Sequence, residues 1–349
     1  MFQNARRSRA LAVAGLTATL LVGACSSSSS GDEQASSQDG LTPVKMAFEW
    51  TCSGDWAVVY EGLEQGIFAD NGVDLTYDRG QGGSDTVPLV AAREFDIGII
   101  SAPPAVIGAG QGMPITIVVA ASTIGPVTIL ADQSIKTPKD LEGHSISVQT
   151  DQFEGAVWDA YANATGIDVS KVNVMPADDA SEAEFLGGKI DAFVVFYPTA
   201  STKAILDQRP NLTVMPMQDN VPTYGHTFLA NNAFLEENGD AAKGFVTGWA
   251  QSAKYVQDHY DESYQRLVSE CPEVSPEALK FSMDAYFDSY TAPYSQEHGF
   301  GSFSVDGIEE TQKVLVDAGL AEATPVAEFT SEDYQPDEPV LPSATPAQP

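Results

Sequence analysis

Short apolar runs alternate with amphipathic stretches over most of the chain between residues 44 and 216. The runs are rich in Val and Ile and are bounded by Gly, Pro, Asn or Asp, which is the pattern of buried strands. The stretches between them show the three- to four-residue spacing of helices that cover a sheet. This alternation predicts an α/β fold with mainly parallel sheets covered by helices.

The pattern divides into two successive series of strands and helices. The first predicts strands at 44–49, 72–80, 96–100 and 113–122, with helices at 56–68, 85–95 and 105–110. The second predicts strands at 144–150, 171–176, 190–196 and 212–216, with helices at 135–143, 153–165, 181–188 and 198–207. A last strand, 225–232, is followed by helical segments at 241–259, 260–269, 276–290 and 305–318.

The four late helical segments have no strands of their own, so they must pack on a sheet that is already built. We therefore expect two lobes, with the chain crossing between them twice, near 122–127 and 219–225. The expected division is a leader at 1–24, a Ser-rich tether at 25–42, lobe 1 at 43–124 with 225–325, lobe 2 at 125–224, and a disordered, Pro-rich and acidic tail at 326–349.

The first residues have the features of a targeting segment. Arg6, Arg7 and Arg9 precede an apolar run over residues 10–22, and small residues then lead to Cys25. The run is too short for a persistent membrane span. A small-residue cleavage site that ends in cysteine resembles a bacterial lipoprotein signal, which implies cleavage before Cys25 and a membrane anchor on its sulfur. The alternative is an ordinary signal peptide with an incidental cysteine.

The net charge of the chain is −32. After loss of the leader, 14 basic residues remain against 49 acidic ones. A surface of this charge repels nucleic acid and anionic lipid headgroups, so we expect no nucleic-acid partner. Outside the cytoplasm Cys52 and Cys271 are able to form a disulfide, but two lone cysteines are as often free and buried, and the sequence leaves this choice open.

No catalytic or metal-binding motif is evident. The four histidines, His144, His226, His259 and His298, lie on separate elements without metal-ligand spacing. The sequence also contains neither a nucleophile elbow nor a phosphate-binding loop of the P-loop type. We therefore expect no metal site, and nothing in these motifs indicates a catalytic one, although sequence alone does not exclude a triad formed in space.

Candidate binding residues gather at the predicted ends of strands, where ligands of open α/β sheets bind. A glycine-rich turn at Gly82 and Gly83 lets the backbone approach a guest, and Ser84 or Asp85 is placed to cap the next helix. The full set of predicted ligand-binding residues is Glu49, Trp50, Asp55, Gly82, Gly83, Ser84, Ser101, Gln149, Thr150, Asp151, Tyr197 and Tyr224. The plainer alternatives are packing for the glycines and aromatics, and helix capping for Asp55.

Several stretches together resemble the solute-binding lipoproteins of ABC importers for thiamine pyrimidine precursors, sulfonates and nitrate. They are VVYEGLEQGIFADNGVDLTY, LVAAREFDIGII, IKTPKDLEGHSISV, FLGGKIDAFVVFYP and GIEETQKVLVDAGL. The resemblance implies a two-lobed, hinged periplasmic-binding-protein fold with no enzymatic activity and no cofactor. It also implies a small-molecule solute, a separate permease and ATPase as partners, and a monomer. Where the family has a glycine after Leu-Val-Ala-Ala, this chain has Arg93.

The charge at the predicted strand ends favours one ligand class. Glu49, Asp55, Asp85 and Asp151 crowd this edge, whereas Arg79 is the one basic residue near it. An anion would meet repulsion there, but an amino-bearing aromatic heterocycle would stack on Trp50 or Tyr197 and donate to a carboxylate. We therefore expect an aromatic nitrogen heterocycle, with a thiamine-type pyrimidine leading. The alternatives are an anion receptor, an extracytoplasmic enzyme of the same fold, and a lipoprotein that binds a protein partner.

Overall fold

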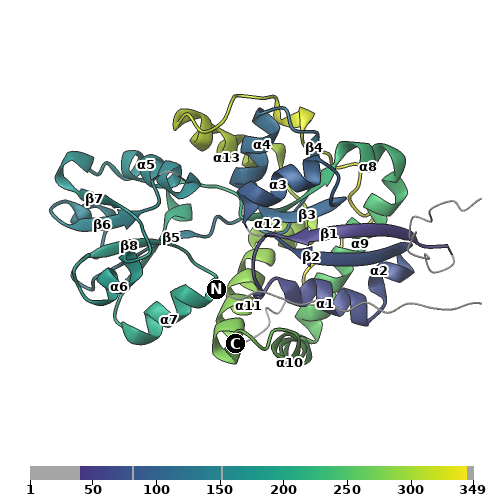
Figure 1. Cartoon of the computed structure of the whole chain (residues 1–349), viewed down its shortest axis with the longest axis horizontal. Coiled ribbons are helices and arrows are strands. Elements are labelled where there is room, and N and C mark those ends of the chain that lie inside the picture. Colours follow the sequence, from purple (N-terminus) through teal and green to yellow (C-terminus); the bar gives the residue numbers. More distant parts are fainter. Residues whose placement is uncertain (1–39, 81, 151, 344–349) are drawn as a thin grey trace, which may run out of the picture. The chain divides into compact units, whose positions relative to one another are not determined.

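The computed structural model describes residues 40–80, 82–150 and 152–343, and within them it contains two five-stranded sheets (Figure 1). The first sheet has the order β2-β1-β3-β10-β4 and contains β1 (Thr42–Phe48), β2 (Val73–Arg79), β3 (Ile97–Ser101), β4 (Ile115–Ala120) and β10 (His226–Asn231). The second has the order β7-β6-β8-β5-β9 and contains β5 (Val127–Ala131), β6 (Ser145–Val148), β7 (Asn173–Pro176), β8 (Ala192–Phe196) and β9 (Thr213–Pro216). We call the first sheet with its helices lobe 1 and the second with its helices lobe 2.

In each sheet the strand that enters from the other lobe runs antiparallel to its neighbours. β10 pairs antiparallel with β3 and β4, and β5 pairs antiparallel with β8 and β9, while the other pairs are parallel. An antiparallel strand begins at the edge where parallel strands end. The crossing segments, 121–126 and 220–225, therefore lie at the carboxyl edges of both sheets.

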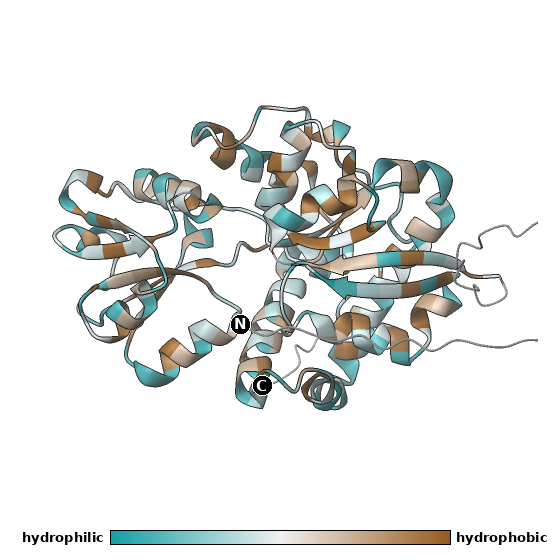
Figure 2. Ribbon diagram, in the orientation of Figure 1, coloured by the Kyte–Doolittle hydropathy of each residue, from teal (hydrophilic) through white to brown (hydrophobic). Residues whose placement is uncertain are grey.

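Helices cover the sheets on both sides, as the alternating pattern predicts. Those of lobe 1 are α1 (Trp56–Glu64), α2 (Ile67–Asp70), α3 (Gly83–Ala91), α4 (Ala102–Gly110), α8 (Asn232–Glu237), α9 (Gly239–Asp258), α10 (Tyr260–Glu270), α11 (Pro276–Tyr290), α12 (Pro293–His298) and α13 (Val305–Asp317). Those of lobe 2 are α5 (Phe153–Thr165), α6 (Ser181–Leu186) and α7 (Ala200–Gln208), with short 3₁₀ turns η1 (Pro138–Leu141), η2 (Val169–Lys171) and η3 (Met217–Asp219). Many helices carry both hydrophobic and hydrophilic bands (Figure 2).

The two faces of the first sheet bury different cores. Met46 and Phe48 pack with α1 and α9, while Ala47, which points the opposite way, packs with α3, α4 and α13. The ring of Phe48 stacks on Trp56, the first residue of α1, with centroids 3.7 Å apart. No helix in the described parts of the chain combines the length and the apolar character needed to cross a membrane.

The structure corrects several sequence expectations. It contains β5, α8 and α12, which the pattern did not single out. The expected disorder of the tail is wrong for residues 326–343. Val326 and Phe329 are buried. Ile117 N donates a hydrogen bond to Phe329 O at 2.8 Å, and Ser331 N donates one to Ile117 O at 3.0 Å. The physical reason is that β4 is an edge strand with free backbone groups, and the tail pairs with that edge. Residues 344–349 lie outside the described residues.

Arg93 is the one described non-glycine residue with a positive φ, 61°. This is the left-handed conformation that favours glycine, which accounts for the family's glycine at this position. The strain is tolerated where α3 ends, and the Arg93 guanidinium pairs with Glu237 at 2.6 Å.

A disulfide joins Cys52, in the loop between β1 and α1, to Cys271, the residue after α10, with their Cα atoms 6.0 Å apart. Both residues are buried. The bridge therefore anchors the loop after β1 to the late helices of lobe 1, across a sequence separation of 219.

We predict that the double variant Cys52→Ala/Cys271→Ala will be less stable than the wild type by about 2–4 kcal/mol, because the closed loop restricts the unfolded chain. Urea unfolding of both proteins, with and without a thiol reductant, measures this difference. The reductant should lower the stability of the wild type alone. Equal stability of the wild type and the double variant in the absence of reductant would contradict a structural role for the bridge.

Candidate functional site

Three residues far apart in the sequence meet at the carboxyl edge of the first sheet. Glu49 directly follows β1, Ser101 is the last residue of β3, and His226 is the first residue of β10. His226 pairs with Ser101 in the antiparallel ladder. The reversal of β10 therefore brings a strand beginning next to two strand ends, and the three side chains share one place.

The Glu49 carboxylate is the centre of this group. Its Oε2 accepts hydrogen bonds from Ser101 N at 3.0 Å and from Ser101 Oγ at 2.9 Å, and it lies 3.1 Å from His226 Nε2. A Cβ on Gly83 would lie only 2.5 Å from Glu49 Oε1, which is too close for both atoms to keep their places. The glycine-rich turn and the end of β3 thus approach the same carboxylate, and a side chain at position 83 would displace it.

Asp55 approaches the same imidazole from the loop before α1. Its Oδ2 lies 3.7 Å from His226 Nδ1, which is too far for a hydrogen bond, and Ser53 Oγ donates to its Oδ1. His226 Nδ1 is buried and has no hydrogen-bond partner among the described residues. Asp55 stands at the N-cap position of α1, but its side chain makes no cap bond. Helix capping, the plainer alternative for Asp55, is therefore wrong, because the carboxylate turns toward Ser53 and His226.

Burial and charge act in opposite directions on this cluster, which consists of Glu49, Asp55 and His226. Burial disfavours the imidazolium, but the hydrogen bond to Glu49 and the charge of Asp55 outweigh it and raise the pKa of His226 above 6.5. Burial raises the pKa of the Asp55 carboxyl above 3.8, although the charge of His226 opposes this. The Tyr286 ring stacks on His226 with centroids 5.1 Å apart, and burial raises the pKa of its hydroxyl well above 10.0.

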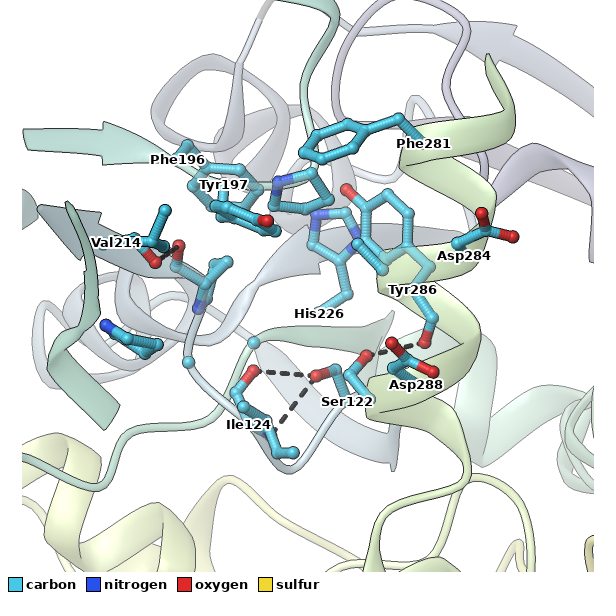
Figure 3. Close-up of a pocket in the computed structure, with 18 residues that line it drawn as sticks. Ser122, Ile124, Phe196, Tyr197, Val214, His226, Phe281, Asp284, Tyr286 and Asp288 are labelled. Carbon is cyan, nitrogen blue, oxygen red and sulfur yellow. Dashed lines mark hydrogen bonds between the residues drawn. The ribbon is translucent and has the colours of Figure 1, made fainter. Parts of the chain in front are cut away.

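A cavity of about 490 Å³ opens beside this cluster, with His226 in its wall. Phe196 and Tyr197 come from the end of β8 in lobe 2, and Phe281 and Tyr286 come from α11 in lobe 1 (Figure 3). The Tyr197 and Phe281 ring centroids are 5.1 Å apart, and those of Phe196 and His226 are 6.0 Å apart. Both crossing segments also contribute to the wall, the first through Ser122, Ile124, Gly125 and Pro126 and the second through Gly225.

The α11 side of the cavity is one helix face. Phe281, Asp284, Ala285, Asp288 and Ser289 all line it, at the spacing of residues that share a face. Asp284 is paired with Lys280 and accepts from Tyr260, whereas the carboxylate of Asp288 makes no hydrogen bond to any described residue. Burial and the charge of Asp284 raise the pKa of Asp288 above 3.8. Among the described residues that line the cavity, none is Lys or Arg.

The predicted site residues are distributed unevenly around this cavity. Tyr197 lines it. Glu49, Asp55 and Ser101 do not line it, but they lie next to His226, which does. Trp50, next to Gly82, is 58% exposed and does not line it. Gln149 and Thr150 are exposed and also lie outside its lining, and Asp151 is not among the described residues. Neither Gly82, Gly83 nor Ser84 lines it.

Two of these residues have other roles. Tyr224 is buried against α13, where its backbone N donates to Thr311 Oγ1 at 2.9 Å and its hydroxyl lies 3.2 Å from Ser304 Oγ. Ser84 is exposed inside α3, because the helix begins at Gly83, so neither Ser84 nor Asp85 is its cap. Gly82, with a φ of 120°, occupies the N-cap position instead.

The residues that the sequence reasoning missed are His226, which both Glu49 and Asp55 approach, and the α11 face. A signal for the first was present, because His226 begins the strand that returns from the other lobe. The second is visible as the spacing of Phe281, Asp284 and Asp288 in a predicted helix. Neither signal says that the residues face a cavity, since this depends on how α11 packs.

Comparison with known sequences places the chain in a family. Residues 53–263, more than half of the chain, match the family described as NMT1/THI5 like. The chain belongs to the NMT1/THI5-like family. The matched range includes Asp55, Ser101 and His226, together with most of the lobe 2 wall of the cavity.

Relatives of this NMT1/THI5-like chain have diverged far in sequence. It is 22% identical to the formylaminopyrimidine-binding protein of Halalkalibacterium halodurans over 258 residues, which cover 73% of this chain and 77% of the relative. The periplasmic aliphatic sulphonate binding protein of Escherichia coli superposes with a TM-score of 0.65 at 14% identity, covering 82% and 96% of the two chains. A desulfurization enzyme superposes with a TM-score of 0.60 at 13% identity, covering 83% and 97%. The fold is therefore that of periplasmic binding proteins, as the resemblance implied.

The described residues around the cavity do not form a metal-binding site. In residues 40–80, 82–150 and 152–343, no group of three or more His, Cys, Asp or Glu side chains is arranged to hold a metal ion. The hydroxyls of Ser53 and Ser101, which adjoin the cluster, donate to carboxylates rather than to His226. The arrangement thus orients charges and does not resemble a nucleophile bonded to its base.

We predict a pH dependence of stability that originates at His226. Its pKa is raised in the folded state, so its contribution is complete below the unfolded value of about 6.5 and is lost as the pH rises through the folded value. The charged and titratable groups around it are Glu49, Asp55 and Tyr286. The free energy of unfolding of the wild type should therefore fall above pH 6.5.

The variant His226→Gln should lack this fall and should be less stable by about 1–3 kcal/mol near pH 6, because Glu49 loses a charged partner. Urea titrations at a series of pH values measure both effects. His298→Gln, which changes an exposed histidine, is the matched control and should retain the wild-type profile. A wild-type slope that persists in His226→Gln would assign it to other groups.

Proposed function

We propose that this protein is the extracytoplasmic solute-binding component of an ABC importer, and that its cavity captures an amino-bearing aromatic nitrogen heterocycle. The observation that carries this proposal is the cavity wall, in which aromatic rings from both lobes stand beside carboxylates. Such a wall can enclose a flat guest when two lobes close on it. Family membership and the periplasmic-binding-protein fold support the receptor class, and a permease and an ATPase would be the partners.

The chemistry of the wall supports a heterocycle. Phe196, Tyr197, Phe281 and Tyr286 offer faces and edges on which a flat ring gains about 0.5–1.5 kcal/mol per aromatic pair beyond its buried area. Asp288 is a carboxylate without a hydrogen bond to described residues, so it is available to accept one from an amino group. The formylaminopyrimidine-binding relative supports a pyrimidine, and a thiamine-type pyrimidine precursor is the leading candidate.

A sulfonate- or nitrate-type anion is the main alternative ligand, because one structural neighbour is a sulphonate-binding protein. The composition of the cavity wall is unfavourable for an anion. An anion needs donors or a basic side chain, whereas this wall contains Asp284 and Asp288 and, among the described residues, no Lys or Arg. The imidazolium of His226 is already balanced by Glu49 and Asp55.

An enzyme is a second candidate because a buried imidazole with a free Nδ1 stands beside two carboxylates, and an enzyme is among the structural neighbours. A base of this kind would need a substrate proton within reach. A lipoprotein that binds a protein partner is the third candidate function. Chromatographic analysis of a candidate ligand after prolonged incubation separates receptor from enzyme, because a receptor returns the ligand unchanged.

We predict that calorimetry with the full protein will detect tight binding of a hydroxymethyl aminopyrimidine or its formylamino analogue, and no comparable binding of nitrate or an alkanesulfonate. Tyr197→Ala and Phe281→Ala should each weaken binding about tenfold, because each removes one ring of the wall. Tyr255→Ala, on α9 and outside the cavity lining, is the matched control and should bind like the wild type. Glu49→Gln and Trp50→Ala test, in the same assay, two of the binding residues that the sequence predicts.

A preference for anions over heterocycles would contradict the proposed function. Tight binding of a sulfonate or nitrate, without comparable binding of an aminopyrimidine, would overturn the heterocycle proposal. A thermal-shift screen over pyrimidines, flavins, sulfonates, nitrate and aromatic acids would precede calorimetry, because a ligand at 100 times its dissociation constant adds about 2.7 kcal/mol.

We further propose that the mature protein is anchored to the outer face of the cell membrane through Cys25, which lies outside the described residues. The support is the basic and apolar leader that ends at this cysteine. Metabolic labelling with a fatty acid, followed by detergent phase partition, should find the wild type labelled and in the detergent phase. Cys25→Ala should be unlabelled, and a labelled Cys25→Ala protein would contradict the anchor.

A further inference from the structure

One buried hydroxyl on α11 bonds to both lobes. Ser282 is 2% exposed, and its Oγ accepts a hydrogen bond from Gly54 N in lobe 1 at 2.9 Å. The same Oγ donates to Pro198 O, beyond the end of β8 in lobe 2, also at 2.9 Å. A serine hydroxyl has one proton to donate and lone pairs to accept, so both bonds form together.

The lobe 1 partner of Ser282 belongs to the loop that carries a cluster residue. Gly54 lies between Ser53 and Asp55, and a Cβ on Gly54 would overlap the backbone of Met283. The loop is therefore in direct backbone contact with α11. Two residues earlier, Cys52 is bonded to Cys271, five residues before α11 begins. The disulfide fixes one side of this loop, and the Ser282 bond fixes its centre.

The lobe 2 partner belongs to the cavity wall. Pro198 lines the cavity with Tyr197, whose ring contacts Phe281, the neighbour of Ser282 on α11. The carbonyl of Pro198 has a fixed place in this turn, because Tyr197 N donates to Pro126 O at 3.0 Å in the crossing segment. Ser282 therefore connects three parts of the site, namely the loop of Asp55, the α11 face and the Tyr197–Pro198 turn.

We propose that Ser282 is a positioning residue that latches the two lobes together around the cavity. Its hydroxyl holds the Ser53–Asp55 loop and the Tyr197–Pro198 turn against α11, and so sets how firmly a captured solute is retained. This inference deepens the proposed function and rests on it for its effect on ligand affinity. The latch itself is testable without a ligand, because it is made of protein groups alone.

The ligand-free test is hydrogen exchange in the full protein. Ser282→Ala removes the acceptor of Gly54 N, so the amide of Gly54 should exchange at least roughly threefold faster, in line with the loss of one buried hydrogen bond. Ser252→Ala is the matched control. Ser252 is equally buried, but its Oγ donates to Gly248 O within α9, so that variant should leave exchange at Gly54 unchanged. Small-angle scattering should also find a larger radius of gyration for Ser282→Ala alone.

The ligand test uses the aminopyrimidine of the proposed function. Ser282→Ala should weaken binding by roughly threefold to tenfold, through faster dissociation, because a hydrogen bond that holds lobe 2 against α11 is lost. Ser282→Thr keeps the hydroxyl and should recover slow dissociation, which a general loss of stability would not allow. Equal dissociation rates for the wild type and Ser282→Ala would overturn the latch, and so would equal weakening in Ser252→Ala.

Failure of the proposed function gives a different result. If the wild type binds no aminopyrimidine, the receptor proposal fails for that ligand class, and hydrogen exchange and scattering alone decide the latch. Faster exchange at Gly54 with an unchanged radius of gyration would restrict Ser282 to a role inside lobe 1 and would overturn the proposed link between the lobes.

Discussion

The reversal of one strand in each sheet is the constraint on which the rest of the structure depends. A chain that crosses from one lobe to the other leaves at the carboxyl edge of a parallel sheet and must enter the second sheet at the corresponding edge. β5 and β10 therefore run antiparallel to their neighbours, and their first residues lie next to the strand ends. His226 reaches Glu49 and Ser101 for this reason. The cavity and both crossing segments occupy the same edge.

The cluster at this edge combines opposite charges under strong burial. Removing a carboxylate from water is costly unless hydrogen bonds replace the water, and Glu49 receives three donors at one oxygen. Asp55 has fewer donors, which agrees with the raised pKa of its carboxyl. A buried charge that is held on several sides keeps its position, so the cluster gives the cavity a rigid wall. This rigidity is useful to a site that must recognise a small solute by orientation.

α11 gives the site its second half, and it does so from a part of the chain that contains no strands. One of its faces supplies aromatic and acidic residues to the cavity, and Ser282 connects it to both lobes. Its other residues, among them Leu279, Met283 and Phe287, are buried in the core of lobe 1. A helix that is anchored in one lobe and contacts the other can transmit a change at the cavity to the relative position of the lobes.

The sequence by itself determined the α/β class, both strand series apart from β5, and the family, because apolar periodicity and turn residues are local properties that survive in a single chain. It also marked Glu49, Ser101 and Tyr197, since strand ends can be located from the same pattern. It did not show that Gln149 and Thr150 lie outside the cavity lining, that Tyr224 packs against α13, or that the tail pairs with β4. Only tertiary structure decided these points, together with the convergence on His226 and the cavity face of α11. The physical reason is that each depends on which elements meet in space, through strand reversal and helix packing. Residues that meet in this way, such as Gly54 and Ser282, are up to 228 positions apart in the chain.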